Sequence, residues 1–479
     1  MRNVEAVKKQ FVDNVRRFAS VHELLVYGGK YIIALSGGAD SVSLLLVMRE
    51  LSDVLGIKIE AAHCNFHLRG AESMRDEDFC RGLCDRLCVP FHVIHFATKD
   101  YADLHHVSIE MAARELRYQY FERLRHDINA DDVCVAHHRD DSVETVILNL
   151  VRGTGIRGLR GIQPRNGHIV RPLLSVSRDE IIGYLDCLRQ DFVTDSTNLV
   201  DDVKRNKVRL NVLPLLKSLN PSVSKAVFET SLRMNEAFKV FDRAVDESAH
   251  EVMSLSDGKS VDDDNVAVPI IIDVDKLFLQ PSAESTLFYI LGSRNFSSSQ
   301  IDDVYDMLVA ERTKGNAVNV SGKTMTSATH ELLFNRGCIM IQPLNYGVSK
   351  RQMRIPEIGM YVYSENLKLA VKEENKTDGY VPSHERSCVC VDAEKLLFPL
   401  CLRPLNNGER FVPFGMSKSK LVSDFLTNRK RSLFDKRRQL VVADADNRII
   451  WLVNEQIDNR CRVTDKSRRI LRLAVVAVD

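Results

Sequence analysis

Over the first two hundred residues, short apolar runs alternate with longer amphipathic stretches. A short apolar run that ends at polar residues is typical of a buried strand, and the longer stretches are typical of helices packed on it. The alternation therefore predicts an α/β domain with a parallel sheet flanked by helices. Ligands of such sheets bind beyond the carboxyl ends of the strands, where polar residues follow each run. The expected strands cover residues 31–35, 58–63, 91–95 and 132–136, and the expected helices follow Ser41, Ser73, Ile109 and Asp141.

The pattern changes after about Leu210, where leucine-rich helical sequence begins, with Pro221 near a helix start. Acidic and Gly-containing residues at 256–265 indicate an exposed loop, and helical patterns resume at 283–291 and 299–308. We therefore expect the α/β domain to be followed by a mainly helical domain and a small basic α+β domain. The expected segments are an α/β catalytic domain at 1–215, a mainly helical domain at 216–343, a connecting region at 344–390 and a basic domain at 391–479.

Composition supports a globular protein of several domains. The 479 residues exceed what one hydrophobic core usually serves. Hydrophobic residues make up 44% and charged residues 27%, which excludes global disorder. The first residues lack the continuous apolar segment of a secretion signal, and no apolar run is long enough to cross a bilayer. We therefore expect a cytoplasmic location without membrane contact.

The eleven cysteines are spread thinly along the chain, and their number is odd. This usage favours reduced thiols over a disulfide framework. Cys80, Cys84 and Cys88 are spaced four apart, which stacks them on one face of a helix and predicts core packing. No Cys-x-x-Cys motif occurs in the sequence.

The net charge of +1 hides an uneven distribution. Residues 402–473 hold 17 Lys and Arg against 8 Asp and Glu, a surplus of nine positive charges. A basic surplus of this kind is the electrostatic feature expected of a nucleic-acid-binding module. The alternative is an ordinary solvated face.

The strongest chemical motif is the loop at residues 36–41, which joins an apolar strand to an apolar helix. Its two glycines allow the backbone to approach an anion, and helix amides with the two serine hydroxyls can hold phosphate oxygens. The loop lacks the Lys of the Gly-x-x-x-x-Gly-Lys motif, so different phosphate chemistry is expected. The alternative is a tight turn with a helix cap. The loop consists of Ser36, Gly37, Gly38, Ala39, Asp40 and Ser41.

A second group of polar residues, at 137–145, follows the fourth expected strand. Asp141 and Glu144 lie on one helical face, where they could bind magnesium or take a proton from an attacking amine. An Asp-x-x-Glu pair at a helix start also fits a capping arrangement, so both interpretations stay open. His137 and His138 have no further Cys or His at zinc-like spacing, which excludes a zinc site.

The 36–41 loop is similar to the pyrophosphate loop of enzymes that cleave ATP between its α and β phosphates. A series of further motifs resembles the tRNA(Ile)-lysidine synthase family in particular. Together with the loop, the series covers residues 36–209. The matching stretches are 63–70 with Glu72 and Ser73, 110–114 with Arg117 and Tyr118, 137–158, 171–174, 195–198 and 205–209.

The resemblance implies a ligase that uses ATP and Mg²⁺ to adenylate the wobble cytidine of tRNA(Ile) with the anticodon CAU. Free lysine then displaces AMP, and the lysidine formed changes the codon read from AUG to AUA. The resemblance implies that Asp40 helps to bind magnesium. We add Asp141 as a second magnesium ligand, and we expect Asp40, Asp141 and Glu144 to be catalytic residues. The target base must leave its loop to be reached. Residues expected to contact RNA or substrate are Arg114, His137, Arg205, Asn206 and Arg209.

The last part of the chain resembles the C-terminal domain of the same family more loosely, at 403–404, 408–416, 422–426 and 462–464. Where the family commonly carries Gly-x-Arg-Ile, this chain has Asn454, Glu455, Gln456 and Ile457, which puts a specific contact there in doubt. The sequence leaves open whether the chain forms a homodimer. It also leaves two other functions open: a tRNA thiolase, which ordinarily needs catalytic cysteines, and a non-catalytic RNA-binding protein.

Overall fold

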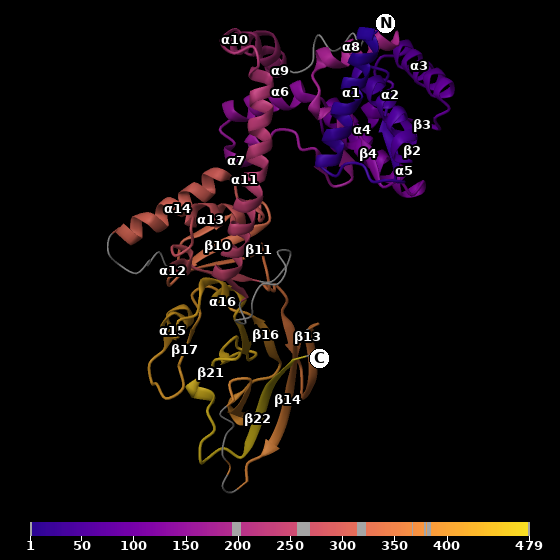
Figure 1. The fold of residues 1–479 in the computed structure, drawn as a ribbon. Helices are drawn as coiled ribbons and strands as arrows, with labels where there is room; N and C mark the ends of the chain where they lie inside the picture. Colours follow the sequence, from indigo (N-terminus) through magenta and orange to yellow (C-terminus); the bar gives the residue numbers. More distant parts are fainter. Residues whose placement is uncertain are drawn as a thin grey trace. The chain divides into compact units, whose positions relative to one another are not determined.

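The computed structural model describes residues 2–193, 203–255, 269–313, 322–365, 367–377, 380 and 385–477. The chain forms two compact units, Met1–Phe241 and Asp242–Asp479, and each is described by itself. The colours of Figure 1 follow the chain through them. None of the described helices carries an apolar stretch long enough to cross a membrane.

The first unit is built on a six-stranded sheet in the order β3-β2-β1-β4-β6-β5. The first five strands of this order run parallel, and β5 pairs antiparallel with β6 at one edge. The parallel sheet predicted from the sequence is therefore confirmed. Its strands are β1 (Lys30–Ala34), β2 (Lys58–Asn65), β3 (Phe91–His95), β4 (Asp132–Cys134), β5 (Arg165–Asn166) and β6 (Ile169–Val170).

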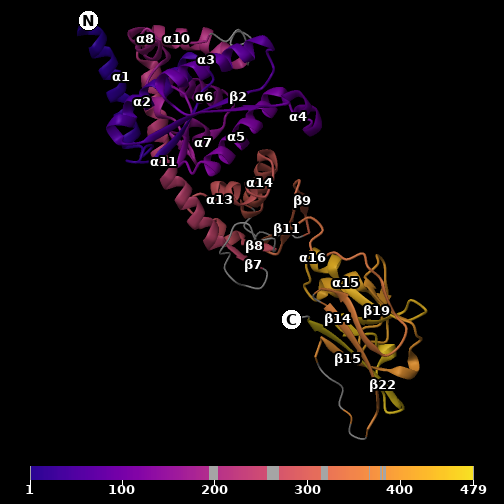
Figure 2. The ribbon, with the colours of Figure 1, turned by 90° about the vertical axis from the view of Figure 1, so that its right-hand side faces the viewer.

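Helices cover both faces of this sheet, as Figure 2 shows. Tyr31 and Ile33 of β1 pack with one group of helices, whereas Ile32 packs with Tyr120 and Phe121 of α5 on the other face. This alternation follows from the two-residue period of a strand. The helices are α1 (Arg2–Val21), α2 (Ala39–Leu55), α3 (Ala71–Leu87), α4 (Thr98–His105), α5 (Ile109–Asp127), α6 (Arg139–Val151), α7 (Gly155–Leu159), α8 (Arg178–Leu188), α9 (Val203–Lys207), α10 (Leu213–Leu219) and α11 (Val223–Val252), with single turns at Pro172–Ser175 and Val208–Val212.

The eleven cysteines are free thiols, as their distribution predicts. Cys80 and Cys84 of α3 are fully buried in the core. Cys88 is exposed, and the expectation that it packs beside them is wrong. Helix α3 ends at Leu87, and Cys88 takes a left-handed conformation as its C-cap, which turns it away from the stacked face.

The second unit begins with a segment richer in strands than its sequence indicates. The expected helices are present and pack against a five-stranded antiparallel sheet in the order β7-β8-β11-β10-β9. The sheet was missed because most of its strands are too short to establish a period of two. Its elements are β7 (Met253–Leu255), β8 (Ile270–Asp273), α12 (Val274–Leu277), α13 (Ala283–Gly292), α14 (Ser298–Thr313), β9 (Thr324–Thr326), β10 (His330–Asn335) and β11 (Cys338–Pro343).

The remainder of the second unit is β-rich, with sheets in the orders β12-β16-β19-β20-β21 and β13-β14-β22-β15 and a two-stranded hairpin. Its strands are β12 (Met353–Ile355), β13 (Gly359–Ser364), β14 (Leu367–Asn375), β15 (Cys388–Asp392), β16 (Leu400–Pro404), β17 (Arg410–Phe411), β18 (Lys420–Leu421), β19 (Leu440–Ala443), β20 (Ile449–Leu452), β21 (Gln456–Ile457) and β22 (Arg469–Ala477). Its helices are α15 (Val422–Asn428) and α16 (Leu433–Arg438), with single turns at Ala393–Lys395 and Asn459–Cys461.

The expected connecting region at 344–390 is not a linker in the structure. It holds β12, β13, β14 and the start of β15, and these strands pair with β16 and β22 from the basic segment. Polar composition suggested a connection because half of each exposed strand faces solvent. Residues from Met353 to Leu473 therefore contribute to one hydrophobic cluster, and a smaller cluster around Phe411 and Phe425 lies within the same range.

Candidate active site

The 36–41 loop leaves the carboxyl end of β1 and turns directly into α2. Gly37 has φ +89°, a left-handed conformation that residues with a side chain rarely adopt. A Cβ at this position would also lie 3.3 Å from the sulfur of Cys80. The Ser41 hydroxyl accepts hydrogen bonds from the amide and the hydroxyl of Ser36, both at 3.1 Å. The two serines therefore hold the turn in shape.

The N-terminus of α2 carries the groups that can meet an anion. Gly38 is the N-cap and Ala39 the first helical residue, and a glycine cap has no side chain to occupy the first-turn amides. Asp40 follows, half-buried, and forms an ion pair with Arg178, the first residue of α8. The loop thus combines free helix amides with a carboxylate beside a cation. This arrangement favours phosphate binding over the simple capped turn.

His138 lies among carboxylates from two elements. Its Nε2 atom is 3.9 Å from Asp40 Oδ1 and 3.6 Å from Asp141 Oδ2, and its Nδ1 atom is 3.9 Å from Asp140 Oδ2. The residue is only 5% exposed, and its Nδ1 has no hydrogen-bond partner in the part of the chain that the structure describes. Asp40 follows β1 and Asp141 follows β4, which are neighbours in the sheet. The topology therefore brings the two predicted metal ligands towards one point.

The geometry of α6 differs from the capping alternative. The helix begins at Arg139 with His138 as N-cap, so Asp141 is its third residue and Glu144 lies in its second turn. Asp141 Oδ2 accepts a hydrogen bond from the His138 amide at 3.1 Å. Asp141 is thus the third-residue partner of the cap, and Glu144 is not part of it.

Glu144 is instead buried between two arginines. Its side chain is 1% exposed. Arg205 Nε donates to it at 2.8 Å, and Arg209 donates from Nε at 2.7 Å and from Nη2 at 3.0 Å. Hydrogen bonding to Glu144 raises the pKa of Arg209. The structure therefore brings together three predicted site residues, with Glu144 oriented by the two arginines that were expected to contact RNA. Both guanidinium groups keep an exposed part.

His137, which follows β4, lies beside a buried arginine. Arg171 Nε donates to His137 Nδ1 at 3.2 Å, and Arg171 Nη1 donates to the carbonyl of Gln163 at 2.7 Å. Burial lowers the pKa of His137 to about 4, so the ring is neutral at physiological pH. Its Nε2 then carries the proton and can donate to a substrate. Arg114 of α5 has its guanidinium 5.1 Å from the Tyr118 ring centroid, and Tyr118 is a hydrogen-bond partner of Arg171. Burial, and in addition the charge of Arg114, lower the pKa of Arg171, so Arg114 also lies beside this group.

The low pKa of His137 makes stability sensitive to acid. The unfolded histidine titrates near 6.5 and the folded one at about 4, so the unfolded chain holds the extra proton between these values. We expect the free energy of unfolding to fall by on the order of 1 kcal/mol per pH unit as the pH drops below about 6.5. Urea titrations at neutral and mildly acidic pH would measure this loss. His137→Gln should show a smaller loss, and equal losses in both chains would contradict the assignment.

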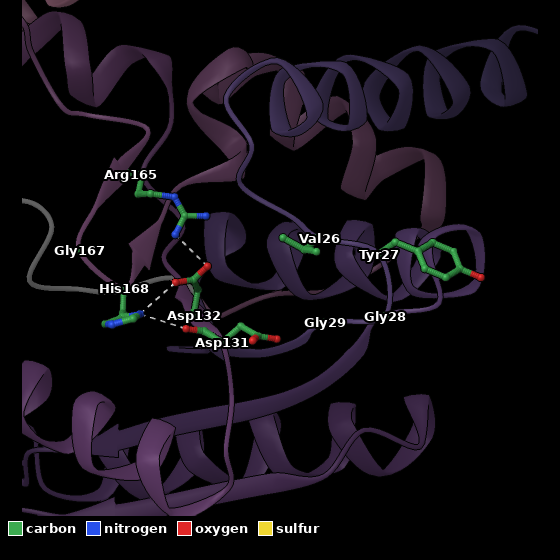
Figure 3. Close-up of a pocket in the computed structure, with 9 residues that line it drawn as sticks. All are labelled: Val26, Tyr27, Gly28, Gly29, Asp131, Asp132, Arg165, Gly167 and His168. Carbon is green, nitrogen blue, oxygen red and sulfur yellow. Dashed lines mark hydrogen bonds and ion pairs between the residues drawn. The ribbon is translucent and has the colours of Figure 1, made fainter. Parts of the chain in front are cut away.

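A cleft of the first unit lies apart from this site. It has a volume of about 670 Å³ and lies at the amino ends of β1 and β4, whereas the 36–41 loop lies at the carboxyl end of β1. Asp132 occupies it with Arg165 at 2.9 Å and His168 at 3.3 Å, as Figure 3 shows. These ion pairs join β4 to the β5–β6 hairpin, so the cleft has a structural explanation.

Several site residues were not selected from the sequence. His138 and Asp140 stand within the recognised 137–145 group, but only the fold shows which of these polar residues face Asp40. Arg171 stands in a matched stretch, whereas no motif marked Arg178. Asn206 lies on α9 beside Arg205, as its spacing implies. The matched stretch at 195–198 lies outside the residues that the structure describes.

Comparisons with known proteins show what the chain is similar to. The PP-loop domain family matches residues 8–216, which implies the use of ATP, and the TilS substrate binding domain family matches residues 268–344. A tRNA(Ile)-lysidine synthase of Bacteroides thetaiotaomicron is 39% identical over 96% of this chain and 99% of its own length. A second one, from Parabacteroides distasonis, is 38% identical over 96% of this chain and 98% of its own length.

Two solved structures are also similar in part. A U34-tRNA thiolase from Methanococcus maripaludis has 18% identity and a TM-score of 0.43 over 48% of this chain and 80% of its own. The C-terminal domain of a TilS protein has 17% identity and a TM-score of 0.24 over 27% of this chain and 99% of its own.

Proposed function

The chain belongs to the tRNA(Ile)-lysidine synthase family, and from this premise we propose that it joins free lysine to the wobble cytidine of tRNA(Ile) with the anticodon CAU. ATP provides the activation, and the products are lysidine, AMP and pyrophosphate. The modified tRNA then reads AUA instead of AUG. Lysine and the tRNA would meet in the cytoplasm.

One observation supports the proposal above all others. The 36–41 loop, which contains no Lys residue, the N-terminus of α2 and the carboxylates of Asp40 and Asp141 lie together where β1 and β4 end. Cleavage between the α and β phosphates needs a site that holds pyrophosphate as it leaves, and the free amides of α2 suit that task. Among the described residues, no cysteine belongs to a group of three or more Cys, His, Asp or Glu that could hold a metal ion, and the sequence has no Cys-x-x-Cys motif. The thiolase alternative therefore has no cysteine site in its favour.

The reaction proceeds in two displacements. The carbonyl oxygen at position 2 of the cytosine attacks the α phosphate of ATP, and the bond to pyrophosphate breaks. The lysine amine, after losing a proton, then attacks the base carbon, and the bond to AMP breaks. Asp141 lies near the loop and is the candidate acceptor of that proton. Neutral His137 can donate a hydrogen bond to the base or the phosphate.

Asp40 and Asp141 fit a magnesium site in part. Their oxygens approach the same His138 nitrogen, and carboxylate oxygens are ligands that Mg²⁺ prefers. Two protein ligands leave the other positions to phosphate oxygens and water, which is common for this ion. Bound Mg²⁺ would neutralise charge on the phosphates.

The decisive experiment measures pyrophosphate release with purified chain, ATP, tRNA and lysine. We expect release to require the tRNA and the modified nucleoside to form only when lysine is added. A requirement for a sulfur donor would favour the thiolase, and tRNA binding without pyrophosphate release would favour a non-catalytic RNA-binding protein.

Removal of the basic C-terminal segment should weaken tRNA binding. A cut at Asp392 would leave β13 and β14 without β22, so we place the cut after Pro343, at the end of β11. The surplus of nine positive charges lies beyond it. We expect tRNA affinity to fall at least about tenfold and the salt dependence to become shallower, because fewer counterions are released.

The control for this truncation is ATP binding, which should be unchanged because the 36–41 loop lies in the first unit. Titrations at several salt concentrations would provide both slopes. Identical slopes for the truncated and full chains would show that the basic surplus is only a solvated face.

A further inference from the structure

The β17–β18 hairpin presents an aromatic side chain to solvent. Phe414 is 53% exposed and Met416 is 44% exposed, and both lie in the loop between the two strands. Exposed apolar residues are common singly, but an exposed ring in a basic segment is a candidate surface for stacking. Its significance depends on whether the loop is held in place.

The loop is fixed at its start. At its base, Phe411 is fully buried, and its ring meets that of Phe425 edge-on at a centroid distance of 5.0 Å. Asp458 Oδ2 accepts a hydrogen bond from the Val412 amide at 3.0 Å, and Val412 O accepts one from the Asn459 amide at 2.8 Å. The start of the loop therefore cannot move independently of the segment after β21.

The tip of the loop is fixed as well. Asn459 accepts a hydrogen bond from the Gly415 amide at 3.1 Å and donates one to the Met416 carbonyl at 2.8 Å. Gln456 donates to the Phe414 carbonyl at 3.3 Å. Gln456, on β21, therefore supports the aromatic loop. Because its backbone is already ordered, the Phe414 ring would lose little entropy on contact with a ligand.

Residues 410–421 of the hairpin carry three positive charges and no carboxylate. Arg410, Lys418 and Lys420 lie on its strands and loop, and within the described residues 385–477 none of the three forms an ion pair with a carboxylate. Arg429 donates a hydrogen bond to Gln456 Oε1 at 3.4 Å, so a fourth cation lies beside the residue that holds the loop. Unpaired cations around an aromatic ring match an RNA strand, whose phosphates are anionic and whose unpaired bases stack on aromatic rings.

We propose that Phe414, held out by Gln456 and Asn459, is a stacking platform for an unpaired nucleotide of the substrate tRNA. Arg410, Lys418 and Lys420 would contact the adjoining phosphates. This inference rests on the proposed function, since it assumes that tRNA is the substrate. It adds a contact by which the second unit distinguishes a tRNA with an unpaired nucleotide from a uniform duplex.

The test measures tRNA affinity for variants of the full chain. We expect Phe414→Ala to weaken binding about tenfold, as loss of one stacked base typically does. The salt slope should stay unchanged, because no cation is removed. Phe414→Tyr should bind as the unaltered chain does, whereas Phe414→Leu, which keeps apolar area without a ring, should resemble the alanine variant. Leu397→Ala, an exposed apolar change in the same unit, should have no effect.

The second arm measures affinity for a blunt RNA duplex, which has no unpaired nucleotide. Phe414→Ala and the unaltered chain should bind this duplex with equal affinity. The inference is overturned if Phe414→Ala binds tRNA within about twofold of the unaltered chain, or if the duplex shows the same loss as tRNA. Failure of the proposed function would look different, since the unaltered chain would then release no pyrophosphate with tRNA and lysine.

Discussion

Asp40→Ala is expected to reduce tRNA-dependent pyrophosphate release by on the order of 1,000-fold while the protein stays folded. The carboxylate lies at the start of α2, beside the amides that would hold phosphate, and faces His138 opposite Asp141. Its removal takes away a candidate magnesium ligand. The stability cost should be small because the side chain is half-exposed and its ion pair with Arg178 is partly solvated.

The matched control is Asp53→Ala. Asp53 lies on the same helix, is exposed and forms an ion pair with Arg49 at 2.7 Å, but it stands near the other end of α2. Pyrophosphate release should be unchanged in this variant. Substantial release by Asp40→Ala, measured at saturating magnesium, would remove Asp40 from the reaction.

The second large effect is expected for Asp141→Asn. Asparagine can still accept the hydrogen bond from the His138 amide, so stability should change by less than about 1 kcal/mol. If Asp141 binds magnesium or accepts the proton of lysine, loss of its charge should lower lysidine formation on the order of a hundredfold. Single-turnover formation of the modified nucleoside is the measurement.

Asp435→Asn is the control for helix capping. Asp435 is the third residue of α16 in the second unit and accepts from the Ser432 amide at 3.0 Å, so it repeats the capping role of Asp141 outside the candidate site. We expect near-normal lysidine formation in this variant. If Asp141→Asn were equally active, Asp141 would be a capping residue only.

Glu144→Gln combines two effects. Its carboxylate accepts three hydrogen bonds from Arg205 and Arg209, so the amide variant should lose roughly 1–3 kcal/mol of stability. Activity should fall as well, because both arginines lose the group that orients them. Comparison of activity with melting temperature separates this positioning role from the direct role tested at Asp141.

The parts of the site that are contiguous in sequence could be predicted, and the parts joined by tertiary contacts could not. Ser36, Gly37 and Ser41 form one turn whose conformation depends on neighbouring residues, so the loop was recognisable from its own sequence. The pairing of Glu144 with Arg209 joins positions 65 residues apart. No local pattern specifies such a pair.

The same distinction holds for the fold. Strands β1 to β4 are apolar runs separated by helices, and their parallel arrangement was expected from this alternation. Strands β5 and β6 have two residues each and were not predicted. In the second unit, β8 has four residues and β17 has two, which is too short for a period to be recognised. The pairing of β14 with β22 is long-range, so residues 344–390 resembled a linker.

The order in which strands become available during translation follows from the position of β22. It lies between β14 and β15 in the sheet, yet the ribosome makes it after both. Domains generally fold as they emerge from the ribosome, so the first unit can fold while the sheet of the second unit still lacks β22. A chain released before β22 is complete would carry an intact nucleotide loop together with the unpaired edges of β14 and β15. Such edges promote aggregation, which would expose truncated products to chaperones and proteases before they could engage a substrate.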